Sequence, residues 1–329
     1  MDFQKSCLQI EKEISDKFHD KHFDSGILSD SYKRLGYQER SFRVLNCGTE
    51  LSWRIPEDYS ESPKLYHANF CKDRLCPMCS WRRTKKIYGQ VSQVMDHLEG
   101  QYRYVFVTLT VRNCSADELS VIIDKMQNAF SLLRHYKRIK SAFKGYFKAL
   151  EITRSPDHPP CWEYHPHFHC IFAVNKSYFK SNSYIKRDEL AELWASAMGL
   201  NYYPQVDIRT VKDKDGTDGD TSIKKAVLEV AKYSVKSCDV LHGSNDQIDD
   251  VVYHLFCALA GRRMCSFGGA FKKAAQELKL DDMLDGDLVL TDGDKLRKDV
   301  AYLLVTYQWR VGFGYERAYA RRLESEDMK

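Results

Sequence analysis

The sequence predicts an α+β protein built on a mostly antiparallel sheet. Three segments alternate apolar and polar residues with a period of two, as strands do: residues 103–111, 145–153 and 165–174. Between the first two, residues 116–140 carry apolar side chains at helical spacing. The order strand, helix, strand, strand favours a ferredoxin-like (RRM-like) sheet with helices on one side.

The segments around this core predict further helices and a separate module. Residues 1–46 are polar and helical in pattern, residues 81–99 form a helix with a basic beginning, and residues 186–198 and 222–237 form two more helices. Residues 47–80 hold four cysteines and few periodic signals. We therefore expect a loop-rich metal module there.

Composition limits where the protein is expected to act and what kind of partner it is expected to bind. No stretch approaches the apolar length that crosses a bilayer, and the N-terminus is polar, so we expect a cytoplasmic protein without a membrane partner. Eleven cysteines in such a chain argue for metal ligands and buried thiols over disulfides. The net charge is only +4, but residues 71–90 carry six Lys/Arg against one Asp. Such a basic surface suits a polyanionic partner, or is a solvated helix face.

Three histidines alternate along the strand at 165–174, so His165, His167 and His169 point to one face. A hairpin would lay Glu151, on the preceding strand, beside them. Two histidines and a carboxylate with open positions suit Mg²⁺ or Mn²⁺ acting as a Lewis acid on a phosphate oxygen. We expect His167, His169 and Glu151 to bind, with His165, just before a proline, as a further candidate. The alternative is a surface strand with coincidental histidines.

A nucleophile for phosphoryl transfer is found on the helix at 222–237. Glu229 and Tyr233 are four residues apart and share one face, with Lys225, Lys232 and Lys236 on or near it. The lysines would hold phosphate and favour the tyrosinate. Tyr233 would form a phosphotyrosyl intermediate, and Glu229 would act as a general base. By itself a Glu/Tyr pair on a helix is usually structural.

The four upstream cysteines predict a structural zinc site. Three follow a C-x₄-C-x₂-C pattern around a tight CPMC turn, and one stands before them: Cys71, Cys76, Cys79 and Cys47. Four thiolates would make a closed tetrahedral site. His67, four residues before Cys71, is the alternative fourth ligand, and reduced cysteines packed in a core are the alternative to zinc.

The segments VFVTLT, LEIT, HPHFH and EVAKY, in this order, resemble the HUH endonuclease superfamily. More narrowly, they resemble the replication initiator (Rep) proteins of small rolling-circle plasmids from Gram-positive bacteria. The resemblance extends from about Cys47 to about Phe271 and includes FCKDRLCPMCSWRR and GRRMCSFGGAFK. It implies an N-terminal helical and zinc-binding module at 1–100, an HUH core at 101–240, and a C-terminal segment at 241–329 that packs on the core or helps to bind DNA.

The resemblance also implies a mechanism. His167 and His169, with Glu151, would hold the divalent ion. Tyr233 would cut one strand at the plasmid's double-strand origin, at a single-stranded or hairpin nick site, and stay on the 5′ phosphate while the freed 3′ hydroxyl primes synthesis. Glu229 matches a glutamate that activates water for the terminating cleavage. A host helicase is a further expected partner.

The basic run after the cysteines is expected to contact this DNA. A metal-rigidified platform with arginines and an aromatic ring would bind the backbone or stack on a base, through Arg74, Trp81, Arg82, Arg83, Lys85 and Lys86. Two alternatives stay open. One is a related transposase or relaxase, although relaxases usually place the tyrosine upstream of the histidines. The other is a non-catalytic zinc-ribbon DNA-binding protein with a second structural metal site.

Overall fold

The computed structural model describes residues 2–154, 163–211, 223–231, 240–289 and 300–323. The chain divides into two compact units. The first unit is formed by residues 1–86, 240–253 and 287–329, and the second by residues 87–239 and 254–286. The first unit thus groups residues 287–329 with residues 1–86. None of the described helices is long and apolar enough to span a membrane.

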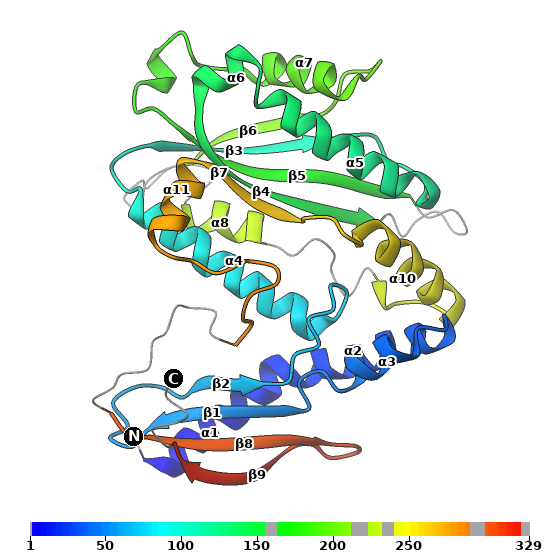
Figure 1. The fold of residues 1–329 in the computed structure, drawn as a ribbon, viewed down its shortest axis with the longest axis vertical. Coiled ribbons are helices and arrows are strands. Elements are labelled where there is room, and N and C mark those ends of the chain that lie inside the picture. Colours follow the sequence, from blue (N-terminus) through cyan, green and yellow to red (C-terminus); the bar gives the residue numbers. More distant parts are fainter. Residues whose placement is uncertain (1, 155–162, 212–222, 232–239, 290–299, 324–329) are drawn as a thin grey trace. The chain divides into compact units, whose positions relative to one another are not determined.

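The second unit contains a five-stranded antiparallel sheet (Figure 1). Its order is β6 (Val206–Val211), β3 (Arg103–Thr110), β5 (Tyr164–Val174), β4 (Phe143–Arg154) and β7 (Cys265–Gly269). The three strands predicted by alternation are therefore confirmed as β3, β4 and β5. The two central pairings, β3 with β5 and β5 with β4, are both antiparallel.

Helices cover both faces of this sheet, because apolar side chains of its strands point to each face in turn. On one face, α5 (Ala116–Leu133) and α7 (Arg187–Met198) pack through aromatic rings, where Phe168 of β5 lies 5.7 Å from Phe130 and 6.3 Å from Trp194 between centroids. The helix predicted over 116–140 ends at Leu133, where a tight turn leads into α6 (Lys137–Ala142). α8 (Ile223–Ala231) and α11 (Ala270–Glu277) lie on the opposite face (Figure 1).

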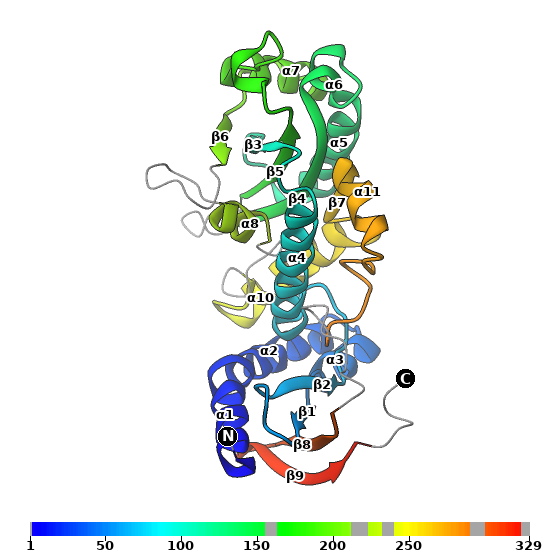
Figure 2. The ribbon, with the colours of Figure 1, turned by 90° about the vertical axis from the view of Figure 1, so that its left-hand side faces the viewer.

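The first unit combines helices with a four-stranded antiparallel sheet. α1 (Phe3–Ile14), a π-helical turn (Ser15–His19), α2 (Asp20–Arg34) and α3 (Gln38–Leu45) confirm the helical N-terminus. The sheet order is β2 (Lys64–Ala68), β1 (Glu50–Pro56), β8 (Tyr302–Arg310) and β9 (Gly314–Arg322), with α1 on one face (Figure 2). α4 (Pro77–His97) and α10 (Asn245–Leu259) each begin in the first unit and end in the second.

This sheet corrects the expectation of a loop-rich stretch at 47–80. β1 and β2 form an antiparallel pair there, and β1 also pairs along its whole length with β8. Ser52 and Thr306, whose hydroxyl oxygens lie 2.9 Å apart, are both buried in this pairing. The partner strand lies about 250 residues away in sequence, and local periodicity carries no signal of so distant a pairing.

Candidate functional site

Strand register brings Glu151, His167 and His169 together. Glu151 of β4 lies directly opposite His167 of β5, and Thr108 of β3 lies opposite His169. Because residues two apart share a face, both imidazoles point away from the α5 side, to which the intervening Phe168 points. The sheet therefore fixes the three side chains before any ligand is bound.

The three side chains converge on one point. Nε2 of His169 lies 2.9 Å from Oε2 of Glu151, and Nε2 of His167 lies 3.4 Å from the same oxygen. The two Nε2 atoms are 3.1 Å apart. All three residues are at least nine-tenths buried, and each offers one ligand atom within 4.8 Å of the others. This is the donor set that a small divalent cation needs.

The outer ring nitrogens support this assignment. Nδ1 of His167 lies 3.1 Å from the carbonyl oxygen of His165, which can only accept, so a proton on Nδ1 can be donated there and leave Nε2 to a metal. Nδ1 of His169 lies 3.2 Å from the hydroxyl oxygen of Thr108, which can also accept. Thr108 and the His165 carbonyl thus orient the imidazoles toward a metal.

Glu151 is held as a carboxylate. Burial alone would raise the pKa of Glu151, but hydrogen bonding to His167 and His169 holds that pKa well below its ordinary value. A carboxylate oxygen beside two imidazole nitrogens is a mixed O/N set that Mg²⁺ or Mn²⁺ can use. Three protein ligands leave further coordination positions for a substrate oxygen or water.

Helix α8 brings one further predicted residue to this site. Oε1 of Glu229 lies 4.0 Å from Nε2 of His169, and Ala226, Val227 and Val230 of the same helix are buried. The structure thus places Glu229 beside the triad. Tyr233, Lys232 and Lys236 lie outside the described residues, as does the side chain of Lys225.

His165 takes a flanking position. Its ring stacks on that of His167 with 5.1 Å between centroids, but it offers no atom to the convergent group. Its backbone carbonyl, by contrast, contacts Nδ1 of His167. Thr108 was not singled out from sequence, although its place on the polar side of the β3 alternation is a signal that could have identified it.

The four cysteines of the first unit form a second cluster. Sγ of Cys47 lies 3.5 Å from that of Cys79 and 3.6 Å from that of Cys76, and Sγ of Cys71 lies 3.7 Å from that of Cys79. A tetrahedral zinc with Zn–S bonds of about 2.3 Å separates its sulfurs by about 3.8 Å. The four thiols therefore fit a zinc ion.

Local structure positions these thiols. Cys76 and Cys79 flank Pro77 at the beginning of α4, where the helix N-terminus favours thiolates. The backbone N–H groups of Cys71 and Asp73 donate to the sulfurs of Cys47 and Cys71, each at 3.4 Å.

His67 is not part of this cluster. Its exposed ring lies 4.0 Å from a carboxylate oxygen of Glu50, on the β1–β2 pair. Among the described residues of the first unit, the convergent group consists of the four cysteines, with Cys47 as the fourth member.

Three basic residues predicted to bind DNA have a different environment. Arg82 donates to the carbonyl oxygens of Leu288 and Val289 at 2.8 and 2.6 Å, and Lys86 donates to that of Asp287 at 2.8 Å. Arg83 donates to the carbonyl oxygens of residues 72 and 73. All three are buried, so these side chains hold the first unit together and are not available to phosphates. We correct that part of the expected DNA surface.

The rest of the predicted basic run stays partly exposed. Arg74, Trp81 and Lys85 are all intermediate in burial. Nζ of Lys85 lies 4.7 Å from the centroid of the Trp81 ring, and Nζ of Lys21 lies 5.0 Å from it. This aromatic ring is thus flanked by ammonium groups, as in a cation–π arrangement.

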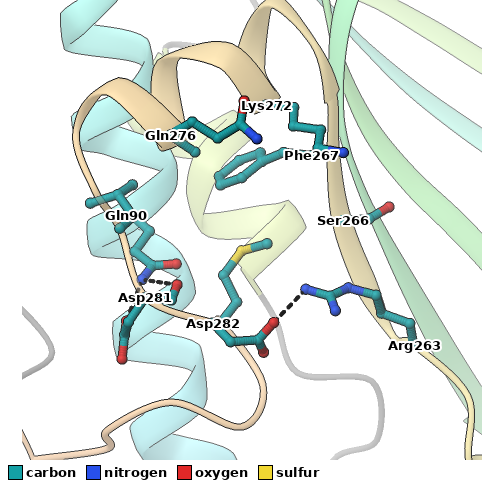
Figure 3. Close-up of a pocket in the computed structure, with 11 residues that line it drawn as sticks. Gln90, Arg263, Ser266, Phe267, Lys272, Gln276, Asp281 and Asp282 are labelled. Carbon is teal, nitrogen blue, oxygen red and sulfur yellow. Dashed lines mark hydrogen bonds and ion pairs between the residues drawn. The ribbon is translucent and has the colours of Figure 1, made fainter.

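A cavity of about 480 Å³ in the second unit has none of the residues of either cluster in its lining (Figure 3). Phe267 of β7 and Lys272 of α11 line one side, and Gln90 of α4 lines another. Arg263 pairs with Asp282 at 2.7 Å, and Gln90 donates to Asp281 at 2.9 Å. Two cations face two carboxylates here, so the lining offers no net charge to hold a phosphate.

The chain is similar in sequence to known replication proteins. The family model described as "Replication protein" matches residues 62–319. The chain is 40% identical to "Protein rep" of a Bacillus species over 293 residues, which cover 84% of this chain and 92% of the relative. It is 36% identical to "Protein rep" of Streptococcus pneumoniae serotype 2 (strain D39 / NCTC 7466), over 82% of this chain and 83% of the relative. No solved structure gives a significant match.

Proposed function

Because this chain belongs to the replication protein family, which includes relatives from Gram-positive bacteria, we propose that it starts rolling-circle plasmid replication by nicking one strand of the origin. The observation that carries this proposal is the convergence of Glu151, His167 and His169 on one point of a buried sheet face. A binding protein without catalysis has no need of a three-ligand site with open positions.

Glu151, His167 and His169 would hold the divalent ion. A Mg²⁺ or Mn²⁺ ion bound there would act as a Lewis acid on a phosphate oxygen of the scissile nucleotide. The sheet supplies the preorganisation, since Thr108 and the His165 carbonyl already fix the two imidazoles. The strand order β6–β3–β5–β4 agrees with a ferredoxin-like core of the HUH type.

Tyr233 is the proposed nucleophile. Its phenolic oxygen loses a proton and forms a bond to phosphorus, while the bond from phosphorus to the 3′ oxygen of the preceding nucleotide breaks and that oxygen gains a proton. The products are a 5′-phosphotyrosyl enzyme and a free 3′ hydroxyl that primes synthesis. Glu229, 4.0 Å from His169, would later take a proton from water, whose oxygen attacks the phosphorus, breaks its bond to the tyrosine oxygen and so releases the enzyme.

The deciding experiment incubates the full chain with single-stranded origin DNA and Mn²⁺. We expect a nick and a covalent adduct mapped to Tyr233. Tyr233→Phe should bind DNA but give neither product. Tyr203→Phe, an exposed tyrosine of the second unit, is the matched control and should nick normally. If Tyr233→Phe still nicks, the proposed nucleophile is wrong, and a non-catalytic DNA-binding role follows if the wild type forms no adduct.

A second variant tests the division of labour between the two helix residues. Glu229→Ala should still nick and form the adduct, because Tyr233 carries out that step. It should release product slowly, since water then lacks its base. Single-turnover nicking and adduct lifetime, measured on the same oligonucleotide, separate the two steps. Normal release by this variant would remove Glu229 from the mechanism.

A further inference from the structure

The hairpin formed by β8 and β9 ends in an exposed apolar tip. Val311 is 90% exposed and Phe313 is 80% exposed, more than any other large apolar side chain in the described part of the chain. The N–H of Phe313 donates to the carbonyl oxygen of Arg310 at 3.0 Å, which closes a tight turn with Gly312 at a φ of 85°. The turn therefore holds both side chains in solvent.

The base of the hairpin is anchored to the cysteine cluster. Trp309 and Tyr315 contact each other with 5.1 Å between ring centroids, and Trp309 also packs on His22 at 4.2 Å. The Tyr315 hydroxyl donates to the carbonyl oxygen of Gly48 at 2.6 Å, next to the zinc candidate Cys47. An apolar tip on such a fixed base is presented to a partner in one orientation.

The hairpin is also basic. Between residues 309 and 322 there are four arginines and one glutamate, and every residue of β9 from Glu316 to Arg322 is exposed. Two of the arginines form ion pairs, Arg310 with Glu316 at 2.9 Å and Arg322 with Glu57 at 2.6 Å, but their side chains stay 60% and 72% exposed. Charges on an edge strand prevent edge-to-edge aggregation, which accounts for the arginines alone. Protection of the edge strand does not account for the two exposed apolar side chains at the tip. Cations along a ribbon with an apolar end complement a phosphate backbone and stacked bases.

We propose that this hairpin binds double-stranded DNA at the origin. Its arginines follow the phosphates, and Val311 and Phe313 insert between neighbouring base pairs and unstack them. This inference rests on the proposed function, since the DNA concerned is the origin duplex. It assigns duplex engagement to the first unit, whereas the strand-cutting residues belong to the second.

The test uses the full-length double variant Val311→Ser/Phe313→Ser. Phe42→Ser is the matched control, because Phe42 is 69% exposed on α3 of the same unit. Affinity is measured by fluorescence anisotropy on origin duplex, and unstacking by 2-aminopurine placed along the origin. We expect the double variant to lose about tenfold or more in duplex affinity, together with the unstacking signal. The control should match the wild type.

Nicking of a preformed single-stranded origin oligonucleotide is measured in parallel, and it should be unchanged in the double variant. This keeps the two proposals apart: a wild type that fails to nick defeats the proposed function, not the hairpin's role. Unchanged duplex affinity and unstacking would overturn the inference and leave the tip to a protein partner or a second copy. An equal loss of single-strand nicking would also overturn it, because the tip would then act in cleavage.

Discussion

The cysteine cluster and the Glu/His site are both candidate metal centres, but they differ in ligands and in completeness. The first collects four sulfurs, which is the full set of a tetrahedral zinc site. The second collects one oxygen and two nitrogens, and these leave positions open. A closed site has no free coordination position for a substrate, whereas an open site has at least one. One metal would therefore stabilise the fold, and the other would take part in the reaction.

The two centres also differ in what holds them when no metal is present. Glu151, His167 and His169 are fixed by the ladder of a five-stranded sheet. The cysteines come from two separate places in the chain, since Cys47 follows α3 and Cys79 lies in the first turn of α4, and their sulfurs lie 3.5 Å apart. Removing metal should therefore cost the first unit its structure and the second unit only its activity.

The largest expected effect is on the cysteine cluster. Cys76→Ser should abolish zinc binding and unfold the first unit, because a structural zinc contributes on the order of 10 kcal/mol to folding. Zinc content by atomic spectroscopy and thermal unfolding by circular dichroism measure this. The same loss should follow from a strong chelator on the wild type. A zinc-free variant with an unchanged melting curve would show that the cluster is not a structural site.

The next effect is on catalysis. His169→Ala should reduce nicking by roughly 10³-fold, about 4 kcal/mol of transition-state stabilisation, because the ion that activates the phosphate is lost. The melting temperature should stay near that of the wild type, since the sheet does not depend on the imidazole. Nicking rates with Mn²⁺ and a melting curve on one preparation decide it. If the second unit unfolds instead, the contrast between the two centres fails.

The sequence predicted the second centre better than the first unit's fold. Alternation along 165–174 and a short connection to the strand of Glu151 were enough to predict Glu151 beside the histidines, and in the structure it lies opposite His167. The C-x₂-C spacing similarly predicted that Cys76 and Cys79 would converge. Both predictions depend on residues close in sequence, where strand and helix geometry fix the side chains.

What could not be predicted depends on distant pairings. β1 is a strand because β8, about 250 residues later, supplies its second neighbour. Arg82 and Lys86 read as solvated cations from their local pattern, but their carbonyl partners come from residues 287–289. No spacing rule within a short window reveals a buried guanidinium whose acceptors lie two hundred residues away. Thr108 was on the polar side of a predicted strand, but it meets His169, 61 residues later, only through the pairing of β3 with β5.

A smaller effect is expected from a change at Thr108, beside the open site. Thr108→Val keeps the shape of the side chain but removes the oxygen that lies 3.2 Å from Nδ1 of His169. Loss of such an outer hydrogen bond typically weakens metal binding by about 10- to 100-fold. Mn²⁺ titration of nicking should show a higher half-saturating concentration, with the maximal rate largely recovered at excess metal. A lower maximal rate with unchanged Mn²⁺ dependence would assign Thr108 a different role.

The smallest expected effect tests whether the cysteine cluster is complete. His67 was the alternative fourth zinc ligand, but its ring is exposed beside Glu50, away from the four sulfurs. His67→Ala should therefore leave zinc content, melting and nicking unchanged, whereas Cys47→Ala should lose zinc as Cys76→Ser does. The pair of variants differs only in which fourth ligand is removed. Zinc loss from His67→Ala would mean that the site is not closed by sulfur alone, and the contrast with the open site would then rest on ligand chemistry and not on completeness.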